Sequence, residues 1–225
     1  MAGKAPAQRK YRIMVVDDHP VVRLGLVQMI SRETDLEVCA EAEGTTSALA
    51  AMDEHHPDLV LVDISLKDGS GLDLIKQVRS RDSSVKILVS SMHDESLFAE
   101  RALRAGAMGY VNKSEAVEKT VTAIRQILGG AIYLSPRMTD RMLRSVAFGE
   151  KEKEGTGSML ERLSDRELEV FELIGRGLTT RETAERLHLS VKTVETYREN
   201  IKMKLNLENN NELICRAAQW ALKEG

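Results

Sequence analysis

Apolar and polar positions alternate in a regular order over residues 1–129. Short apolar runs of strand length are each followed by a longer stretch in which apolar residues recur at helical spacing. The apolar runs are residues 12–16, 36–42, 58–63, 85–90 and 109–111, and the helical stretches are residues 20–32, 45–55, 71–81, 96–104 and 115–128. This alternation predicts an α/β domain in which a five-stranded, doubly wound parallel sheet has helices on both faces.

The pattern changes after this domain. Two adjacent glycines, Gly129 and Gly130, end the last helical stretch, because glycine is a common helix terminator. A Ser-Pro pair then predicts a short helix over residues 137–148, and residues 150–158 form a charged, glycine-containing segment typical of a flexible tether. We therefore expect a first domain at residues 1–129, a linker with a short helix at 130–159 and a second domain at 160–225.

The second domain carries the start signals of several short helices. Two capping boxes and a capping serine mark these starts: Ser164 with Glu167, Thr179 with Glu182, and Ser190. A closing helix follows at about residues 209–222. Two helices, a tight turn at 188–191 and a third helix are the outline of a helix-turn-helix, so we predict a small all-α domain whose third helix enters the DNA major groove.

Composition limits the classes of protein that fit. No run approaches the roughly 18 apolar residues of a membrane span, and residues 1–10 lack the apolar core of a signal peptide, so we expect a cytoplasmic protein. Cys39 and Cys215 lack the spacing of a zinc site and are expected in the core. Because the net charge is −3, any DNA contact must come from a local basic patch.

Reactive side chains follow four of the predicted strands. They are Asp17 and Asp18 after the first strand, Asp63 after the third, Ser90 and Ser91 after the fourth, and Lys113 after the fifth. The carboxyl ends of parallel strands meet at one edge of a sheet, so we expect these groups to converge. Clustered carboxylates need a cation, and with no His or Cys expected beside them the oxygen ligands favour Mg²⁺. The lysine and a hydroxyl complete a cradle for a phosphoryl group, whereas Asp63 alone would be an ordinary loop carboxylate.

Asp17, Asp18, Asp63, Ser91 and Lys113 together resemble the receiver domain of two-component response regulators, which has a flavodoxin-like fold. The resemblance implies that Asp63 is a nucleophile that accepts a phosphoryl group from the phosphohistidine of a sensor kinase. It also implies that Asp17 and Asp18 bind Mg²⁺ together with Asp63. Ser91 is expected to follow the phosphoryl group, and Lys113 to pair with it.

Two further roles rest on the same resemblance. The backbone carbonyl of Ser65 is expected as a metal ligand, and Tyr110 matches the switch aromatic that turns inward when Ser91 moves. Without the resemblance, Ser91 is a strand-end hydroxyl and Tyr110 a half-buried aromatic. The chain departs from the family pattern after the phosphoacceptor, where the usual Met-Pro pair is missing, and at Ser114, which replaces a common proline.

The second domain contains several motifs of another family. They are Leu-Ser-x-Arg-Glu-x-Glu-Val, Gly-Leu-Thr, Glu-Thr-Ala-x-x-Leu and Leu-Ser-x-Lys-Thr-Val-Glu-Thr-Tyr, in that order from Leu163. These motifs closely resemble the LuxR-type DNA-binding domain. Joined to a receiver, they make the chain similar to NarL/FixJ-type response regulators over nearly its whole length.

The LuxR resemblance implies which side chains contact DNA. Backbone phosphates are expected to contact Lys192, Thr193, Tyr197 and Lys202, base edges are expected to contact Glu195, Thr196 and Glu199, and Arg198 adds to the basic patch. As an alternative, Glu195 and Glu199 only pair with Arg198 and Lys202 along the helix. The closing helix resembles the family's dimerisation helix, although its apolar residues could equally cover the domain core.

The resemblances imply a transcriptional regulator whose DNA binding is controlled by phosphorylation of Asp63. Its partners would be a sensor histidine kinase, double-stranded operator DNA and a second copy in the active state, with RNA polymerase as a further candidate. It would not be an enzyme apart from phosphoryl transfer to Asp63 and hydrolysis from it. One rival is a DNA-binding regulator that ignores phosphorylation. Another is a Mg²⁺-dependent phosphatase of the haloacid dehalogenase type, which needs a second acid where Ser65 stands.

Overall fold

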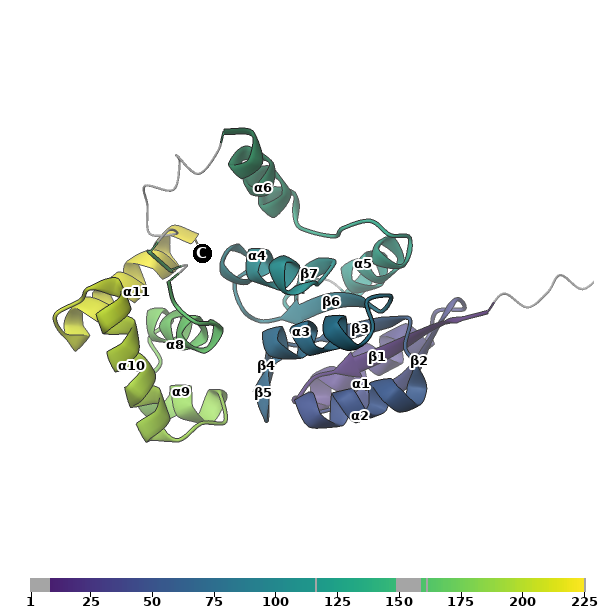
Figure 1. Ribbon diagram of the computed structural model, residues 1–225, viewed down its shortest axis with the longest axis horizontal. Coiled ribbons are helices and arrows are strands. Elements are labelled where there is room, and N and C mark those ends of the chain that lie inside the picture. The colour runs from purple at the N-terminus through teal and green to yellow at the C-terminus, as the bar shows by residue number, and fades with distance from the viewer. Residues whose placement is uncertain (1–8, 116, 149–158, 161, 225) are drawn as a thin grey trace, which may run out of the picture. The chain divides into compact units, whose positions relative to one another are not determined.

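The computed structural model describes residues 9–115, 117–148, 159–160 and 162–224 (Figure 1). The chain folds into two compact units that divide between Leu134 and Ser135. The predicted tether at 150–158 lies outside the described residues. Within the described ranges, no helix combines the length and hydropathy needed to cross a membrane.

The first unit is built on a parallel sheet, which confirms the predicted fold class. Its strands are β1 (Tyr11–Val16), β2 (Leu36–Ala42), β3 (Leu59–Val62), β6 (Lys86–Ser91) and β7 (Gly109–Asn112). They lie in the order β2-β1-β3-β6-β7, and every neighbouring pair is parallel. All four residues of β3 are buried, as expected for an aliphatic strand at the centre of a parallel sheet.

Helices cover both faces of this sheet (Figure 1). They are α1 (Pro20–Ser31), α2 (Thr45–His55), α3 (Gly71–Arg81), α4 (Glu95–Ala105) and α5 (Val117–Leu128). Helices α1 and α5 pack together on one face, and α2, α3 and α4 pack in succession on the other. Ile13, Leu61 and Ile124 belong to the fully buried cluster beneath α1 and α5.

A small antiparallel hairpin follows β3, and the sequence pattern did not predict it. It consists of β4 (Ser65–Leu66) and β5 (Gly69–Ser70). Strands of two residues are too short to show a period of two, so only hydrogen bonds reveal them. The Asp68 carboxylate accepts hydrogen bonds from the backbone N–H groups of Thr45, at 2.5 Å, and Thr46, at 3.1 Å. The hairpin therefore caps the start of α2.

The hairpin closes tightly on the phosphoacceptor candidate. The Gly71 N–H donates to the Ile64 carbonyl at 2.6 Å. A Cβ atom at Gly71 would lie 1.9 Å from the carbonyl oxygen of Asp63, so only glycine fits there. This close approach fixes the backbone on which the Asp63 side chain stands.

The second unit is all-helical, as predicted. Its helices are α6 (Pro136–Phe148), α8 (Asp165–Gly175), α9 (Thr180–Arg186), α10 (Val191–Leu205) and α11 (Asn210–Glu224). Both predicted capping boxes form, at the starts of α8 and α9. The Ser190 hydroxyl accepts from the Thr193 N–H at 3.0 Å and so begins α10.

Close helix packing gives the second unit its core. Phe171 of α8 and Trp220 of α11 are buried, with ring centroids 6.3 Å apart. Gly175 is the last residue of α8. A Cβ there would lie 2.6 Å from the Ala217 carbonyl oxygen, so glycine lets α8 and α11 approach closely. The expectation that Cys215 belongs to the core was wrong, because that side chain is exposed, and Cys39 in β2 is only half-buried.

Candidate functional site

The carboxyl edge of the sheet brings the predicted acidic side chains together. The Asp17 N–H donates to the Ala42 carbonyl at 3.1 Å, and the Asp63 N–H donates to the Val16 carbonyl at 2.9 Å. These hydrogen bonds extend the backbone pairing of β1 and β3 by one residue, so Asp17 and Asp63 both lie at the carboxyl edge of the sheet. Asp17 and Asp63 are buried, with Asp63 only 4% exposed.

Lys113 lies between two of these carboxylates. Its Nζ is 2.6 Å from Asp17 Oδ2 and 2.5 Å from Asp63 Oδ2, and its side chain is 7% exposed. Burial alone would lower the pKa of Lys113, but the charges of Asp63 and Asp17 and their hydrogen bonds outweigh burial, so the pKa is raised above its usual value. The lysine therefore stays charged and neutralises part of the pocket.

The two oxygens of Asp63 have different surroundings. Oδ2 is held by Lys113, whereas Oδ1 is buried without a hydrogen-bond partner among the described residues. A buried carboxylate oxygen without a partner is costly, and such an atom calls for a ligand. Oδ1 is the atom through which Asp63 can bind an ion or attack an electrophile.

The acidic group includes one residue that was not predicted from the sequence, His19. Asp17, Asp18, His19 and Asp63 each offer a ligand atom, and these atoms lie within 4.8 Å of one another. His19 Nδ1 is 2.6 Å from Asp18 Oδ1, so the expectation of no histidine beside the carboxylates was wrong. Its position directly after Asp18 was the available signal. The ring is half-exposed at the start of α1, and three carboxylates remain as oxygen donors suited to Mg²⁺.

The remaining predicted pocket residues lie on β6 and β7. Ser91 ends β6, and its register partner is Asn112, the residue before Lys113. The Lys113 N–H donates to the Ser91 carbonyl at 2.9 Å, which places the hydroxyl and ammonium residues side by side. Tyr110 points into the protein, where it is 1% exposed and its hydroxyl donates to the His93 carbonyl at 2.8 Å.

Ser65 and His93 form a contact that the sequence did not indicate. Ser65 Oγ and His93 Nε2 share a hydrogen bond of 2.7 Å. Ser65 was expected to act only through its backbone carbonyl, and His93 was not expected at the site. No spacing rule identifies His93, because its contacts with Ser65 and Tyr110 join segments far apart in the chain.

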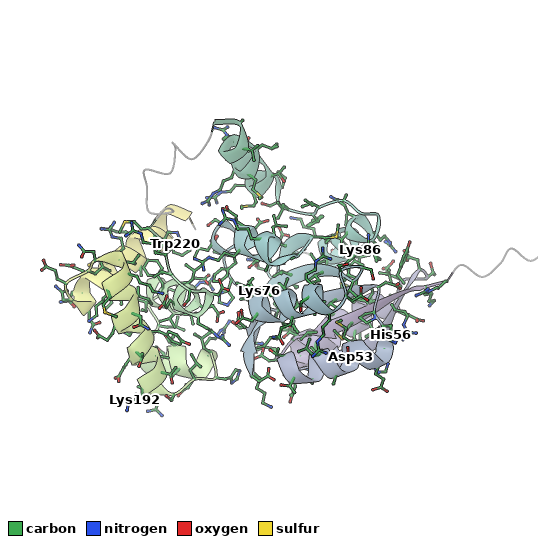
Figure 2. The ribbon with its side chains drawn as sticks, viewed as in Figure 1. Asp53, His56, Lys76, Lys86, Lys192 and Trp220 are labelled. Atoms are coloured by element: carbon green, nitrogen blue, oxygen red, sulfur yellow. The ribbon has the colours of Figure 1, made fainter. Side chains whose placement is uncertain are left out.

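The third helix of the second unit exposes half of its eight predicted DNA contacts, and Lys202 is among the half-buried ones. Lys192, Glu195, Thr196 and Glu199 are exposed on α10, whereas Thr193, Tyr197 and Arg198 are half-buried. Lys192 extends from the first turn of the helix (Figure 2). Two of these side chains also make contacts within the domain: Thr193 Oγ1 lies 2.7 Å from Ser190 Oγ, and Thr196 Oγ1 donates to the Lys192 carbonyl at 3.0 Å.

Two lysines of α10 are engaged with carboxylates. Lys202 Nζ is 2.9 Å from Glu199 Oε1, which matches the alternative of pairing along the helix for this glutamate. Lys204 Nζ donates to Glu167 Oε2 at 2.6 Å and so ties α10 to α8. Because Glu167 engages this ammonium group, Lys204 adds little to a DNA-binding patch.

The sequence left two interpretations of the closing helix, α11: a dimerisation helix or a cover for the domain core. Leu213, Ala217 and Trp220 are buried in the domain core. Ile214 is 45% exposed on the other side of α11. The helix therefore covers the domain core, as the second interpretation predicted, and Ile214 remains partly exposed beside it.

Both units match known families. Residues 13–125 match the response regulator receiver domain, and residues 161–217 match the luxR family of bacterial regulatory proteins. The chain is 34% identical over 215 residues to the oxygen regulatory protein NreC of Staphylococcus carnosus strain TM300, which covers 95% of this chain and 97% of NreC.

Solved structures agree with these matches. A LuxR-family two-component response regulator from Aurantimonas sp. SI85-9A1 is 38% identical with a TM-score of 0.57, covering 60% of this chain and 97% of that chain. The RcsB response regulator of Salmonella typhimurium, whose structure concerns DNA interaction, is 25% identical with a TM-score of 0.57, covering 94% of this chain and 99% of that chain.

The fold, the acidic pocket and these matches together define a two-component response regulator. The chain belongs to the NarL/FixJ family, with a receiver domain followed by a LuxR-type DNA-binding domain. It is a DNA-binding transcriptional regulator controlled by phosphorylation.

Proposed function

We propose that Asp63 is the phosphoacceptor and that its Oδ1 is the attacking atom. The observation that carries this proposal is the difference between its two oxygens: Oδ2 is held by Lys113, and Oδ1 is buried without a hydrogen-bond partner among the described residues. Oδ1 attacks the phosphorus of a phosphohistidine, the P–N bond breaks, and its electron pair stays on the imidazole of the kinase. The product is an acyl phosphate on Asp63.

Asp17, Asp18 and Asp63, together with the Ser65 carbonyl, are the proposed ligands of Mg²⁺. Three carboxylates whose ligand atoms lie within 4.8 Å of one another are a suitable oxygen set for this hard cation. When bound, the ion supplies positive charge against the phosphoryl oxygens. Lys113 supplies a second positive charge, and its contacts with Asp17 and Asp63 hold it in reach of the reacting oxygen.

The phosphoryl group is proposed to be detected by Ser91 and Tyr110. Ser91 ends the strand beside β3, so its hydroxyl is well placed to donate to a phosphoryl oxygen on Asp63. Tyr110 lies on the neighbouring strand β7 and responds to the shift of Ser91. Phosphorylation then releases or dimerises the LuxR-type domain, which binds operator DNA through Lys192, Thr193, Glu195, Thr196, Tyr197, Arg198, Glu199 and Lys202.

The proposed partners follow from this reaction. A sensor histidine kinase supplies the phosphoryl group, and a second copy of the chain completes a two-fold site on operator DNA. RNA polymerase is a further candidate partner. All of these partners meet in the cytoplasm. Apart from phosphoryl transfer to Asp63 and hydrolysis from it, we propose no enzymatic activity.

The test measures binding to a duplex selected from random DNA, with and without acetyl phosphate and Mg²⁺. Wild-type protein is compared with Asp63→Ala, and Asp73→Ala, at an exposed aspartate of α3, is the matched control. We expect acetyl phosphate to tighten binding of the wild type and of the control, and Asp63→Ala to lose this gain. Equal affinity under every condition would favour a regulator that ignores phosphorylation.

A further inference from the structure

His93 has contacts on three sides of the pocket. It follows Ser91 by two residues, in the loop between β6 and α4, and its side chain is buried. Nε2 is 2.7 Å from Ser65 Oγ, and the ring lies against Phe98 with centroids 4.7 Å apart. The His93 N–H donates to Ser91 Oγ at 3.4 Å.

The carbonyl of His93 accepts two hydrogen bonds from β7. The Tyr110 hydroxyl donates to it at 2.8 Å and Asn112 Nδ2 at 3.3 Å. A buried phenol needs a hydrogen-bond partner, because a hydroxyl without one pays its full desolvation cost. The position of this carbonyl therefore decides whether the Tyr110 hydroxyl can stay inside the protein.

The imidazole and the carbonyl of His93 are on one short loop, so fixing the first restrains the second. The hydrogen bond to Ser65 joins this loop to the β4–β5 hairpin, which Asp68 anchors to α2. The β6–α4 loop, whose His93 carbonyl accepts from Tyr110, is thus linked to the β4–β5 hairpin, which supplies the Ser65 carbonyl as a proposed metal ligand. Contacts of this kind couple two parts of a site through one residue.

We infer that His93 is a positioning residue: its hydrogen bond to Ser65 holds the β6–α4 loop where the His93 carbonyl accepts the inward Tyr110 hydroxyl. The inference rests on the proposed function, in which Tyr110 responds to the shift of Ser91. Loss of the Ser65–His93 bond lets the loop move, and Tyr110 then shifts toward solvent. The bond therefore helps to set how readily the receiver switches.

The experiment labels the full-length protein with 3-fluorotyrosine and follows Tyr110 by ¹⁹F NMR. The chain has four tyrosines, and Tyr110→Phe assigns the resonance. The solvent isotope shift between H₂O and D₂O distinguishes a buried ring from an exposed one. His93→Asn and Ser65→Ala each remove the Ser65–His93 hydrogen bond. The asparagine amide is too short to reach Ser65, and alanine lacks the hydroxyl.

Three further variants separate positioning from general damage. His93→Gln extends the amide about as far as Nε2 and should restore the contact. His56→Asn makes the same type of change at an exposed histidine at the end of α2. The Ser65→Ala/His93→Asn double variant should match either single variant, because both changes remove one bond.

We expect the ratio of exposed to buried Tyr110 to rise roughly three- to tenfold in His93→Asn and in Ser65→Ala, the range that one lost hydrogen bond accounts for. His93→Gln and His56→Asn should keep the wild-type ratio. A wild-type Tyr110 resonance in both His93→Asn and Ser65→Ala would overturn the inference, as would additive effects in the double variant.

The same samples test the proposed function separately. Intact mass after treatment with acetyl phosphate and Mg²⁺ reports the phosphoryl group on Asp63. If no phosphoryl group is taken up, the proposed function fails, whereas the Tyr110 ratios in untreated protein still decide the role of His93.

Discussion

At the scale of single residues, the pocket depends on one ammonium group between two carboxylates. Lys113 contacts Asp17 and Asp63 in a position almost closed to water. Removing one partner of a buried ion pair leaves uncompensated charge, which costs far more than the loss of an exposed pair. The lysine therefore supports the fold of the receiver as well as its chemistry.

Lys113→Met should lower the free energy of unfolding of the receiver by roughly 3–5 kcal/mol in buffer without Mg²⁺. Urea denaturation followed by circular dichroism measures the change. The matched control is Lys119→Met, which breaks only an exposed pair with Glu115 and should cost less than about 1 kcal/mol. Equal losses in the two variants would contradict the structural role of Lys113.

A second charged residue makes the DNA-binding domain sensitive to acid. Burial raises the pKa of Glu167, but hydrogen bonds from Lys204 and from Ser164 outweigh it, so the pKa lies below the usual range. The stabilisation from Glu167 is thus complete above the pKa of an unfolded glutamate, about 4.3, and is lost as the pH falls through the lower folded value.

Glu167→Gln should therefore destabilise the domain by about 1–3 kcal/mol near pH 7 and by progressively less below about pH 4. The only tryptophan, Trp220, lies in this domain, so its fluorescence during urea unfolding reports this unit alone. Glu185→Gln, at an exposed glutamate of α9, is the control. Its difference in unfolding free energy from the wild type should not change in this way as the pH falls. A constant difference between wild type and Glu167→Gln from pH 7 to pH 3 would refute the assigned pKa shift.

At the scale of elements, the turn after β3 depends on a glycine. Gly71→Ala should destabilise the receiver by about 1–3 kcal/mol, because its Cβ would meet the Asp63 carbonyl. Gly25→Ala in α1 meets no atom within 4 Å and should stabilise the protein by about 0.5–1 kcal/mol, since alanine favours helix. Paired thermal denaturation measures both. A neutral Gly71→Ala would show that the turn can relax.

The elements differ in how far the sequence predicted them. β3 was predicted because its residues form a continuous apolar run, which is typical of a strand buried on both faces. The longer helices were predicted because apolar residues recur along them at helical spacing, and helix starts were predicted because Ser164 and Thr179 act locally. The β4–β5 hairpin was too short for any period to show. Asp17, Asp63 and Lys113 could be grouped because parallel strands share an edge, whereas His93 joins Ser65 only through loop geometry that no local pattern encodes.

At the scale of the whole molecule, DNA affinity should depend on salt through the cations that remain available on α10. Lys192→Ala should reduce the slope of log affinity against log salt concentration by about 1, because it removes a proposed phosphate contact. Lys204→Ala should leave the slope nearly unchanged, since Glu167 already neutralises that ammonium. Fluorescence anisotropy on one selected duplex between low and high salt measures both slopes. Equal reductions would mean that Lys204 turns to DNA when bound.

The parallel arrangement of the sheet also governs when the chemistry becomes possible. Every strand pair of the five-stranded sheet joins residues far apart in sequence, and Lys113 reaches Asp63 across 50 positions. Such contacts form late during folding, because long loops must close first. A chain still emerging from the ribosome therefore carries its acidic groups before their counter-charge arrives. The receiver thus becomes able to receive a signal in one step, when β7, the last strand, joins the sheet.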